Sequence, residues 1–319
     1  MTKELNQSFS FHSDVDGPRL IVLGAVHGNE ICGTEAIQQL IAEFNAKTIA
    51  LKLGMVTFVP VTNPLAYQRG TRCGDRNLNR MLMPYPEPAL FEDHLANWLC
   101  PLLTRHDVLL DLHSFQGTGQ AFVMVGPEDN SGAIEPFRFA QQERALAKIL
   151  GVKRAVDGWL RTYDSGIRRR QSACNHPVNL PEQNINFGIG TTEYMRSQGG
   201  YGVTLECGNH IDPDAPKVAR SAILNTLTHL GMIDAVTAPQ VQSMESLRLY
   251  EVVDKNHDND VFSRDWASFD PVSKGQIIGW RDTREPVTAA QDGYIVFPDV
   301  GSRAGDEWFY LARFNDRFL

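Results

Sequence analysis

Side chains with the spacing of metal ligands stand at the ends of two apolar stretches. His27 and Glu30 lie three residues apart in a turn that follows one stretch, and Gly28 between them allows that turn to be tight. His113 ends the other stretch. Two imidazoles and one carboxylate form a known catalytic zinc set, which leaves a coordination position open for water. We therefore predict one zinc ion held by His27, Glu30 and His113.

Two further acidic residues belong to the same pattern. Asp111 precedes His113 by two residues, so both side chains lie on one face of a strand, where the carboxylate can orient the imidazole. Glu206 ends the apolar run GVTLE, where an acidic group is costly unless it has a purpose. We predict that Glu206 is the general base and acid of a hydrolysis. A core histidine satisfied by Asp111 alone, and a capping or salt-bridging Glu206, are the alternatives.

Arginines are concentrated in the loop of residues 70–80, which holds Arg72, Arg76 and Arg80 beside Asn77 and Asn79. Guanidinium groups bind carboxylates in bidentate fashion, and one of them could stabilise the oxyanion of a tetrahedral intermediate. The loop therefore favours an acidic small-molecule substrate. A solvated basic loop is the alternative.

Hydrophobic periodicity predicts an α/β fold: a mixed, largely parallel sheet covered by helices on both faces. In such sheets the ligand site lies beyond the carboxyl ends of the strands. The stretches 62–88 and 160–200 read as irregular. The expected strands are 20–26, 55–61, 108–114, 121–126 and 202–207, and the expected helices are 30–44, 89–104, 135–150 and 215–231.

After about residue 240, short extended runs alternate with Gly, Asp and Pro, which predicts a small C-terminal all-β domain. We expect a catalytic domain over residues 1–238 and the small β domain over 239–319. The five cysteines lack a CxxC pair and read as reduced thiols; they are Cys32, Cys73, Cys100, Cys174 and Cys207.

The net charge of −8 over 319 residues argues against nucleic acid as a partner. No stretch is long and apolar enough for a membrane helix or a signal peptide, so we expect a cytoplasmic protein without a membrane partner. The sequence leaves the formation of a homo-oligomer open.

Four motifs occur together in one order: GAVHGNE at 24–30, TR with NR from Thr71 to Arg80, DLHS at 111–114 and LECG at 205–208. In this the chain resembles the succinylglutamate desuccinylase and aspartoacylase family, a branch of the zinc carboxypeptidase superfamily. The resemblance covers roughly residues 20–235, and the C-terminal β region also looks like the family's smaller domain.

The resemblance implies a role for each matched residue. It makes His27, Glu30 and His113 the zinc ligands and Glu206 the general base and acid, and it has Arg72 polarise the scissile carbonyl. A family tyrosine corresponds to Tyr310. The residues that it implies for binding the substrate carboxylate are Asn79, Arg80 and Arg196.

The expected function is that of a zinc-dependent deacylase that cleaves the amide bond of an N-acyl amino acid or a similar small acidic substrate. A carboxypeptidase acting on peptide C-termini, or a non-catalytic binder of acidic metabolites, would use many of the same residues. Region 160–200, with Arg168–Arg170 and Glu193, matches no family pattern. It leaves the acyl group unassigned, and we interpret the arginine triplet as a solvated surface run.

Overall fold

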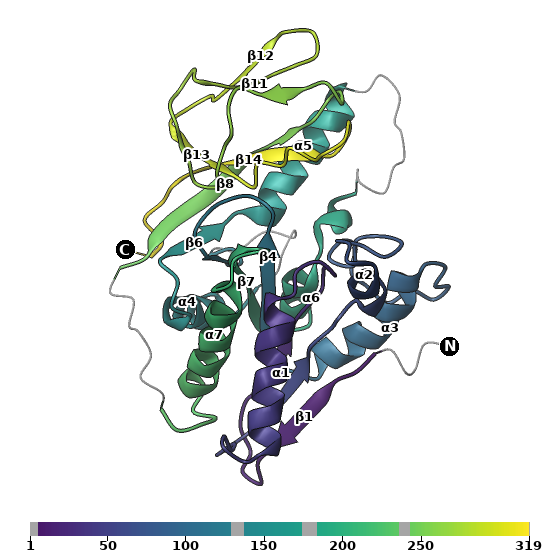
Figure 1. Cartoon of the computed structure of the whole chain (residues 1–319), viewed down its shortest axis with the longest axis vertical. Helices are drawn as coiled ribbons and strands as arrows, with labels where there is room; N and C mark the ends of the chain where they lie inside the picture. Colours follow the sequence, from purple (N-terminus) through teal and green to yellow (C-terminus); the bar gives the residue numbers. More distant parts are fainter. Residues whose placement is uncertain (1–5, 129–136, 174–183, 236–242, 319) are drawn as a thin grey trace.

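The computed structural model describes residues 6–128, 137–173, 184–235 and 243–318 (Figure 1). In these residues one sheet of eleven strands runs through both halves of the molecule. In spatial order its strands are β1 (Phe9–His12), β3 (Met55–Val59), β2 (Arg19–Leu23), β4 (Val108–Phe115), β7 (Tyr201–Asn209), β5 (Phe122–Met124), β6 (Arg154–Asp157), β8 (Glu245–Asp254), β14 (Glu307–Phe314), β13 (Gly293–Val296) and β10 (Pro271–Val272).

The prediction of a mixed sheet is confirmed, but the sheet is parallel only in part: outside its central block, β5 with β6 and β6 with β8 are the parallel pairs. Strands β3, β2, β4 and β7 run parallel to one another. Strand β5 then pairs antiparallel with β7, and β8, β14, β13 and β10 form antiparallel pairs. The expected description "largely parallel" therefore holds for the block that carries the strand, turn and helix of residues 19–45 and not for the whole sheet.

Helices cover both faces of the central block, as predicted. Along β2, Leu20 and Val22 point to one face and Ile21 and Leu23 to the other, and all four are fully buried. The first face packs against α1 (Cys32–Asn45), α4 (Ala140–Ile149) and α7 (Ala215–His229). The opposite face packs against α3 (Phe91–Thr104) and α6 (Thr191–Ser197).

The chain order creates a topological switch point between β2 and β4. Helix α1 leads from β2 to β3 on one face, and α3 leads from β3 back to β4 on the other face. Because β2 and β4 are neighbours, their following loops diverge at their carboxyl ends, and ligands of open α/β sheets bind at such a point. The sequence after β2 continues directly into the predicted metal-binding turn.

The C-terminal β region is present but is continuous with the main sheet. Strand β8 pairs in parallel with β6 and antiparallel with β14, so the hydrogen bonding passes from the first part of the chain to the last. A separate three-stranded sheet contains β12 (Pro286–Thr288), β11 (Ile277–Trp280) and β9 (Val261–Phe262). In Figure 1 this region lies at the end of the molecule opposite β1.

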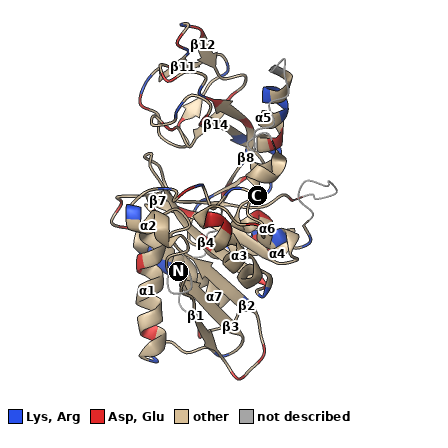
Figure 2. Cartoon of the chain, turned by 90° about the vertical axis from the view of Figure 1, so that its right-hand side faces the viewer, with Lys and Arg blue, Asp and Glu red and all other residues tan. Residues whose placement is uncertain are grey.

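Region 160–200 is not irregular throughout. It contains most of α5 (Trp159–Ala173), followed after the undescribed residues 174–183 by a short 3-10 helix (Ile185–Gly188) and α6. Helix α5 lies along β8, and Figure 2 shows its basic residues beside that strand. Only Arg168 of the triplet is a simple surface residue. Arg170 forms two hydrogen bonds with Asp254, at 2.9 and 3.0 Å, so the interpretation as a solvated run is wrong for it.

In the part of the chain that the structure describes, every helix is too short or too polar to traverse a lipid bilayer. Cys32, Cys73, Cys100 and Cys207 are free thiols. The fifth cysteine, Cys174, lies outside the described residues.

Candidate active site

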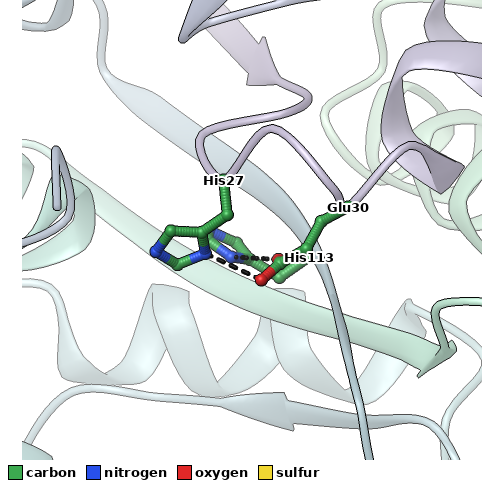
Figure 3. Close-up of side chains that lie close together, drawn as sticks. All are labelled: His27, Glu30 and His113. Carbon is green, nitrogen blue, oxygen red and sulfur yellow. Dashed lines mark hydrogen bonds and ion pairs between the residues drawn. The ribbon is translucent and has the colours of Figure 1, made fainter. Parts of the chain in front are cut away.

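The structure brings the three predicted metal ligands together at the carboxyl ends of β2 and β4. Nδ1 of His27 lies 2.8 Å from one carboxylate oxygen of Glu30, and Nδ1 of His113 lies 2.8 Å from the other. One potential ligand atom from each residue falls within 4.8 Å of the other two, and all three side chains are buried. Figure 3 shows both rings directed at the same carboxylate.

The turn that carries His27 depends on close backbone packing. Strand β2 ends at Leu23, and Ala25 follows in the left-handed region with φ 47°. A Cβ on Gly28 would stand 2.0 Å from the carbonyl carbon of Ala66, in helix α2 (Pro64–Arg69). Only glycine fits there, because no side chain could share that space with backbone. The turn therefore needs its glycine for proximity.

The cluster fits a divalent cation. Nδ1 of His27 is close to Glu30 but makes no hydrogen bond of acceptable geometry with it, as expected of two groups that share a ligand. Burial raises the pKa of Glu30, but the two imidazoles outweigh it and hold that pKa well below its usual range. Burial lowers the pKa of His113, yet Asp111 and Glu30 raise it well above 6.5. The surroundings thus favour a positive charge at the position of His113, between the carboxylates of Asp111 and Glu30.

For His27 the balance is the reverse. Burial, followed by the charge of Arg72, lowers its pKa to about 4. A neutral imidazole is the form that binds metal. His27 is therefore ready to act as a ligand over the whole neutral pH range.

A chain of hydrogen bonds leads from His27 through the arginine loop to Asp111, the ion-pair partner of His113. Nε2 of His27 lies 3.1 Å from Oδ1 of Asn77, which also accepts the backbone N–H of Asn79. Oδ1 of Asn79 accepts the N–H of Thr191 at 2.9 Å.

This series of hydrogen bonds ends at Asp111, beside His113. The Thr191 hydroxyl donates to Asp111, whose carboxylate lies 2.9 Å from Nε2 of His113. Each imidazole thus has an oxygen close to its second nitrogen, Asn77 by a hydrogen bond and Asp111 as an ion-pair partner, an arrangement that commonly orients a metal-binding histidine. Sequence reasoning found Asp111 but missed the roles of Asn77 and Thr191.

Glu206 stands directly beside His113. The parallel register of β4 and β7 pairs the two residues, so their side chains lie on the same face of neighbouring strands. The Glu206 side chain is buried, and its Oε2 has no hydrogen-bond partner. Burial raises the pKa of Glu206 to about 8, with Glu30 adding to the shift and His113 opposing it. A carboxyl group that titrates near neutrality can both take and return a proton.

Arg72 reaches the same point from the loop. Its Nη1 donates to Glu30 at 2.8 Å, while half of the side chain (51%) remains exposed.

The arginine loop is held by Glu92, a fully buried carboxylate at the start of α3. Glu92 accepts four hydrogen bonds of 2.9 to 3.1 Å, from the side chain of Asn63 and the N–H groups of Gly74, Asp75 and Arg76.

The three predicted carboxylate-binding residues have different surroundings. Asn79 belongs to the hydrogen-bond chain, and Arg80 lies next to it, facing Glu307. Arg196 is only 2% exposed, and its guanidinium pairs with Glu143 and donates to the carbonyl of Gly202. These contacts hold Arg196 in the packing of α6 against α4 and β7.

The family model of the succinylglutamate desuccinylase/aspartoacylase catalytic domain matches residues 16–230. The chain belongs to this family. The resemblance seen in the sequence motifs is thereby confirmed, and the matched stretch contains the three predicted metal ligands, Glu206 and the arginine loop.

Relatives of the family share parts of the sequence. A probable aspartoacylase of Prochlorococcus marinus is 34% identical over 116 residues, 34% of this chain and 37% of that protein. The N-alpha-acetyl-L-2,4-diaminobutyric acid deacetylase of Halomonas elongata is 31% identical over 146 residues, 44% of this chain and 40% of that protein. The matched stretch thus spans less than half the length of these curated relatives.

Solved structures of the family share the fold over most of the chain. A succinylglutamate desuccinylase/aspartoacylase from Rhodobacter sphaeroides gives a TM-score of 0.70 at 19% identity, covering 95% of this chain and 87% of that one. The product-bound ectoine utilization protein EutE (DoeB) from Ruegeria pomeroyi also gives 0.70, at 20% identity, covering 96% of this chain and 88% of that one.

Proposed function

We propose that this protein is a zinc-dependent deacylase that hydrolyses the amide bond of an N-acyl amino acid or a similar small acidic substrate. The observation that carries the proposal is the convergence of His27, Glu30 and His113 with Glu206 placed beside His113 by strand register. Membership of the family and the deacetylase named among the relatives support the same reaction class.

Each residue has a role in this proposal. His27, Glu30 and His113 hold the zinc ion, which when bound supplies Lewis acidity that activates water and polarises a carbonyl oxygen. Glu206 takes a proton from the attacking water and later gives it to the departing amine. Its unpartnered Oε2 is free for this exchange.

The arginine loop binds and polarises the substrate in this proposal. Arg72 donates to the oxygen that becomes negative in the tetrahedral intermediate, since its guanidinium already reaches the metal-binding carboxylate. Arg80 binds the carboxylate of the amino-acid portion, with Asn79 fixing the backbone of the loop. We do not include Arg196, whose guanidinium is fully engaged in the core.

The test is an assay of the zinc-loaded protein on N-acetyl and N-succinyl amino acids and on short peptides. We expect hydrolysis of acyl amino acids that is lost when zinc is removed by a chelator and regained with one equivalent of zinc. Glu206→Gln should lower kcat at least about 100-fold and leave zinc binding intact. The exposed Glu285→Gln is the matched control.

Two results would contradict the proposal. Turnover that persists in Glu206→Gln would remove the proposed base. Hydrolysis of peptides but of no acyl amino acid would identify a carboxypeptidase instead.

A further inference from the structure

The strand pairing beside the proposed metal ligands is irregular at Ser114. Strands β4 and β7 pair in parallel up to His113 and Glu206, and their register then shifts because β7 has one residue more than β4 at this point. Gly208 lies in this part of β7 with φ 127°, a conformation that favours glycine. Irregularities of this kind occur beside active sites, where they redirect groups of the strand.

The N–H of Ser114 is directed at the metal cluster. It donates to Oε2 of Glu30 at 3.2 Å, and the same oxygen lies 2.8 Å from Nδ1 of His113. Glu30 is only 1% exposed, so water does not replace a contact that its carboxylate loses. The backbone of Ser114 therefore fixes the oxygen of Glu30 that faces His113.

The side chain of Ser114 is in turn held by His210, which follows β7. Oγ of Ser114 lies 2.8 Å from Nδ1 of His210. The backbone N–H of His210 donates to the carbonyl of Phe115 at 3.0 Å. His210 thus contacts both the residue at the register shift and the residue after it, and joins the two strands where their regular pairing is interrupted.

The turn that carries His210 is fixed by the side chain of the residue before it. Nδ2 of Asn209 donates to the carbonyls of Gln116 at 2.7 Å and Gly117 at 2.9 Å, and its Oδ1 accepts the N–H of Ile211 at 2.9 Å. These contacts hold the backbone on both sides of the half-buried imidazole. His210 is therefore a preorganised support.

We propose that His210 is a positioning residue for the metal site. By holding Ser114, it keeps the N–H of that residue on Glu30, and it thereby sets how tightly the site binds its cation. The inference rests on the proposed function, because that function assigns Glu30 to the metal. Outer contacts of metal ligands typically contribute about 10- to 100-fold to metal affinity.

The experiment measures the zinc affinity of the folded protein by competition with a chromophoric chelator. His210→Ala and Ser114→Ala should each weaken zinc binding about 10- to 100-fold. Because both substitutions remove the same hydrogen bond, the double variant should bind zinc about as well as the single variants. The exposed His94→Ala, on α3, is the matched control and should bind zinc like the wild type.

Two conservative variants test which ring atom matters. His210→Asn places a hydrogen-bonding atom at the δ position of the side chain, like Nδ1, whereas His210→Gln places one at the ε position. The asparagine variant should keep most of the zinc affinity, and the glutamine variant should lose it.

Cobalt(II) in place of zinc gives a second readout, because its visible absorption depends on the arrangement of its ligands. The spectrum of His210→Ala should differ from that of the wild type, and the spectrum of His210→Asn should match it. A purely structural role of His210 would lower the free energy of unfolding of the metal-free protein and move neither the zinc affinity nor the spectrum.

The outcomes separate this inference from the function on which it rests. Wild-type zinc affinity in His210→Ala, or additive losses in the double variant, would overturn the role of His210 while the deacylase function stands. If His210→Ala does not fold, equal affinities of the asparagine and glutamine variants would overturn it instead. A wild-type protein that binds no zinc and hydrolyses no acyl amino acid would remove the proposed function itself.

Discussion

Oδ1 of Asn77 lies 3.1 Å from Nε2 of His27, so the imidazole that offers Nδ1 to a metal is held by its other nitrogen. The same oxygen accepts the N–H of Asn79, which couples the ring to the arginine loop. Loss of such an outer contact typically weakens metal affinity by about 10- to 100-fold.

Asn77→Ala is therefore expected to weaken zinc binding by that factor, measured by competition with a chromophoric chelator. Asn77→Asp keeps an acceptor oxygen and should restore most of the affinity. The exposed Asn45→Ala is the control. Equal affinities for Asn77→Ala and the wild type would show that His27 needs no orienting contact.

Gly28→Ala should disrupt the turn that carries His27 and Glu30, the proposed metal ligands. The added Cβ would stand 2.0 Å from the backbone of Ala66, and neither backbone can move without displacing His27. Overpacking of this kind costs about 1–3 kcal/mol, and backbone against backbone belongs at the upper end. At Gly117, by contrast, a Cβ would meet only a carbonyl oxygen at 3.9 Å.

The measurements are urea denaturation and zinc content of the purified variants. Gly28→Ala should lose both stability and zinc, whereas Gly117→Ala should match the wild type. If the two variants behaved alike, close packing at the turn would not be what requires glycine at position 28.

Glu92→Gln should destabilise the protein through the arginine loop. The carboxylate accepts N–H groups on both oxygens, and the glutamine amide would turn an NH₂ group towards one pair of them. Leaving buried donors without acceptors costs about 1–3 kcal/mol each. We expect a loss of roughly 2–4 kcal/mol in the free energy of unfolding.

Urea denaturation measures this loss, and Glu87→Gln on the exposed part of the preceding loop is the control. Because the loop also carries Arg72 and Arg80, KM for the best acyl amino acid should rise in the folded variant. A stability equal to that of the control would mean that the loop does not depend on Glu92.

His106 should make stability fall as the pH decreases. It is buried, its Nδ1 lies 2.7 Å from the carbonyl of Leu102, and its Nε2 lies 2.9 Å from Oγ1 of Thr57. Burial lowers its pKa below 6.5, so the folded protein binds fewer protons here than the unfolded chain does. The contribution of the neutral ring is complete above pH 6.5 and is lost as the pH falls from there towards the lower, folded-state pKa.

The check is the urea midpoint of wild type and His106→Gln between pH 8 and pH 5. The difference between them isolates His106 from the other histidines and should shrink towards low pH. A difference that grows as the pH falls would reverse the predicted sign.

The sequence predicts the convergence of His27, Glu30 and His113 because these residues lie at or just after the ends of strands. Apolar runs identify β2, β4 and β7, and the residues that end such runs must meet at one edge of a parallel block. His27, His113 and Glu206 are of this kind, and the structure places all three at the carboxyl ends of neighbouring strands. Contacts that depend on loops have no such local signal. Asn77 and Thr191 reach the histidines through tertiary structure alone, and the pairing of Arg80 with Glu307 spans most of the chain.

Helix α5 was missed for a related reason. Its buried apolar residues Leu160, Tyr163 and Ile167 form a narrow stripe on an otherwise polar helix. The amino-acid composition of this segment is therefore similar to that of a loop. Gly166 further weakens the helical pattern, yet it is there because a Cβ would stand 2.6 Å from the side chain of Val252. Packing against β8 thus overrides local propensity.

The hydrogen bonds between β6 and β8 make the last quarter of the chain inseparable from the rest. Truncation before Glu245 would strip one side of β6 and present an unpaired edge, which invites aggregation. It would also remove Glu307 and Tyr310 together. The protein should accordingly unfold in one cooperative thermal transition. Replacing its C-terminal segment with that of a relative should require a new strand that pairs with β6, and a suitable linker alone should not be enough.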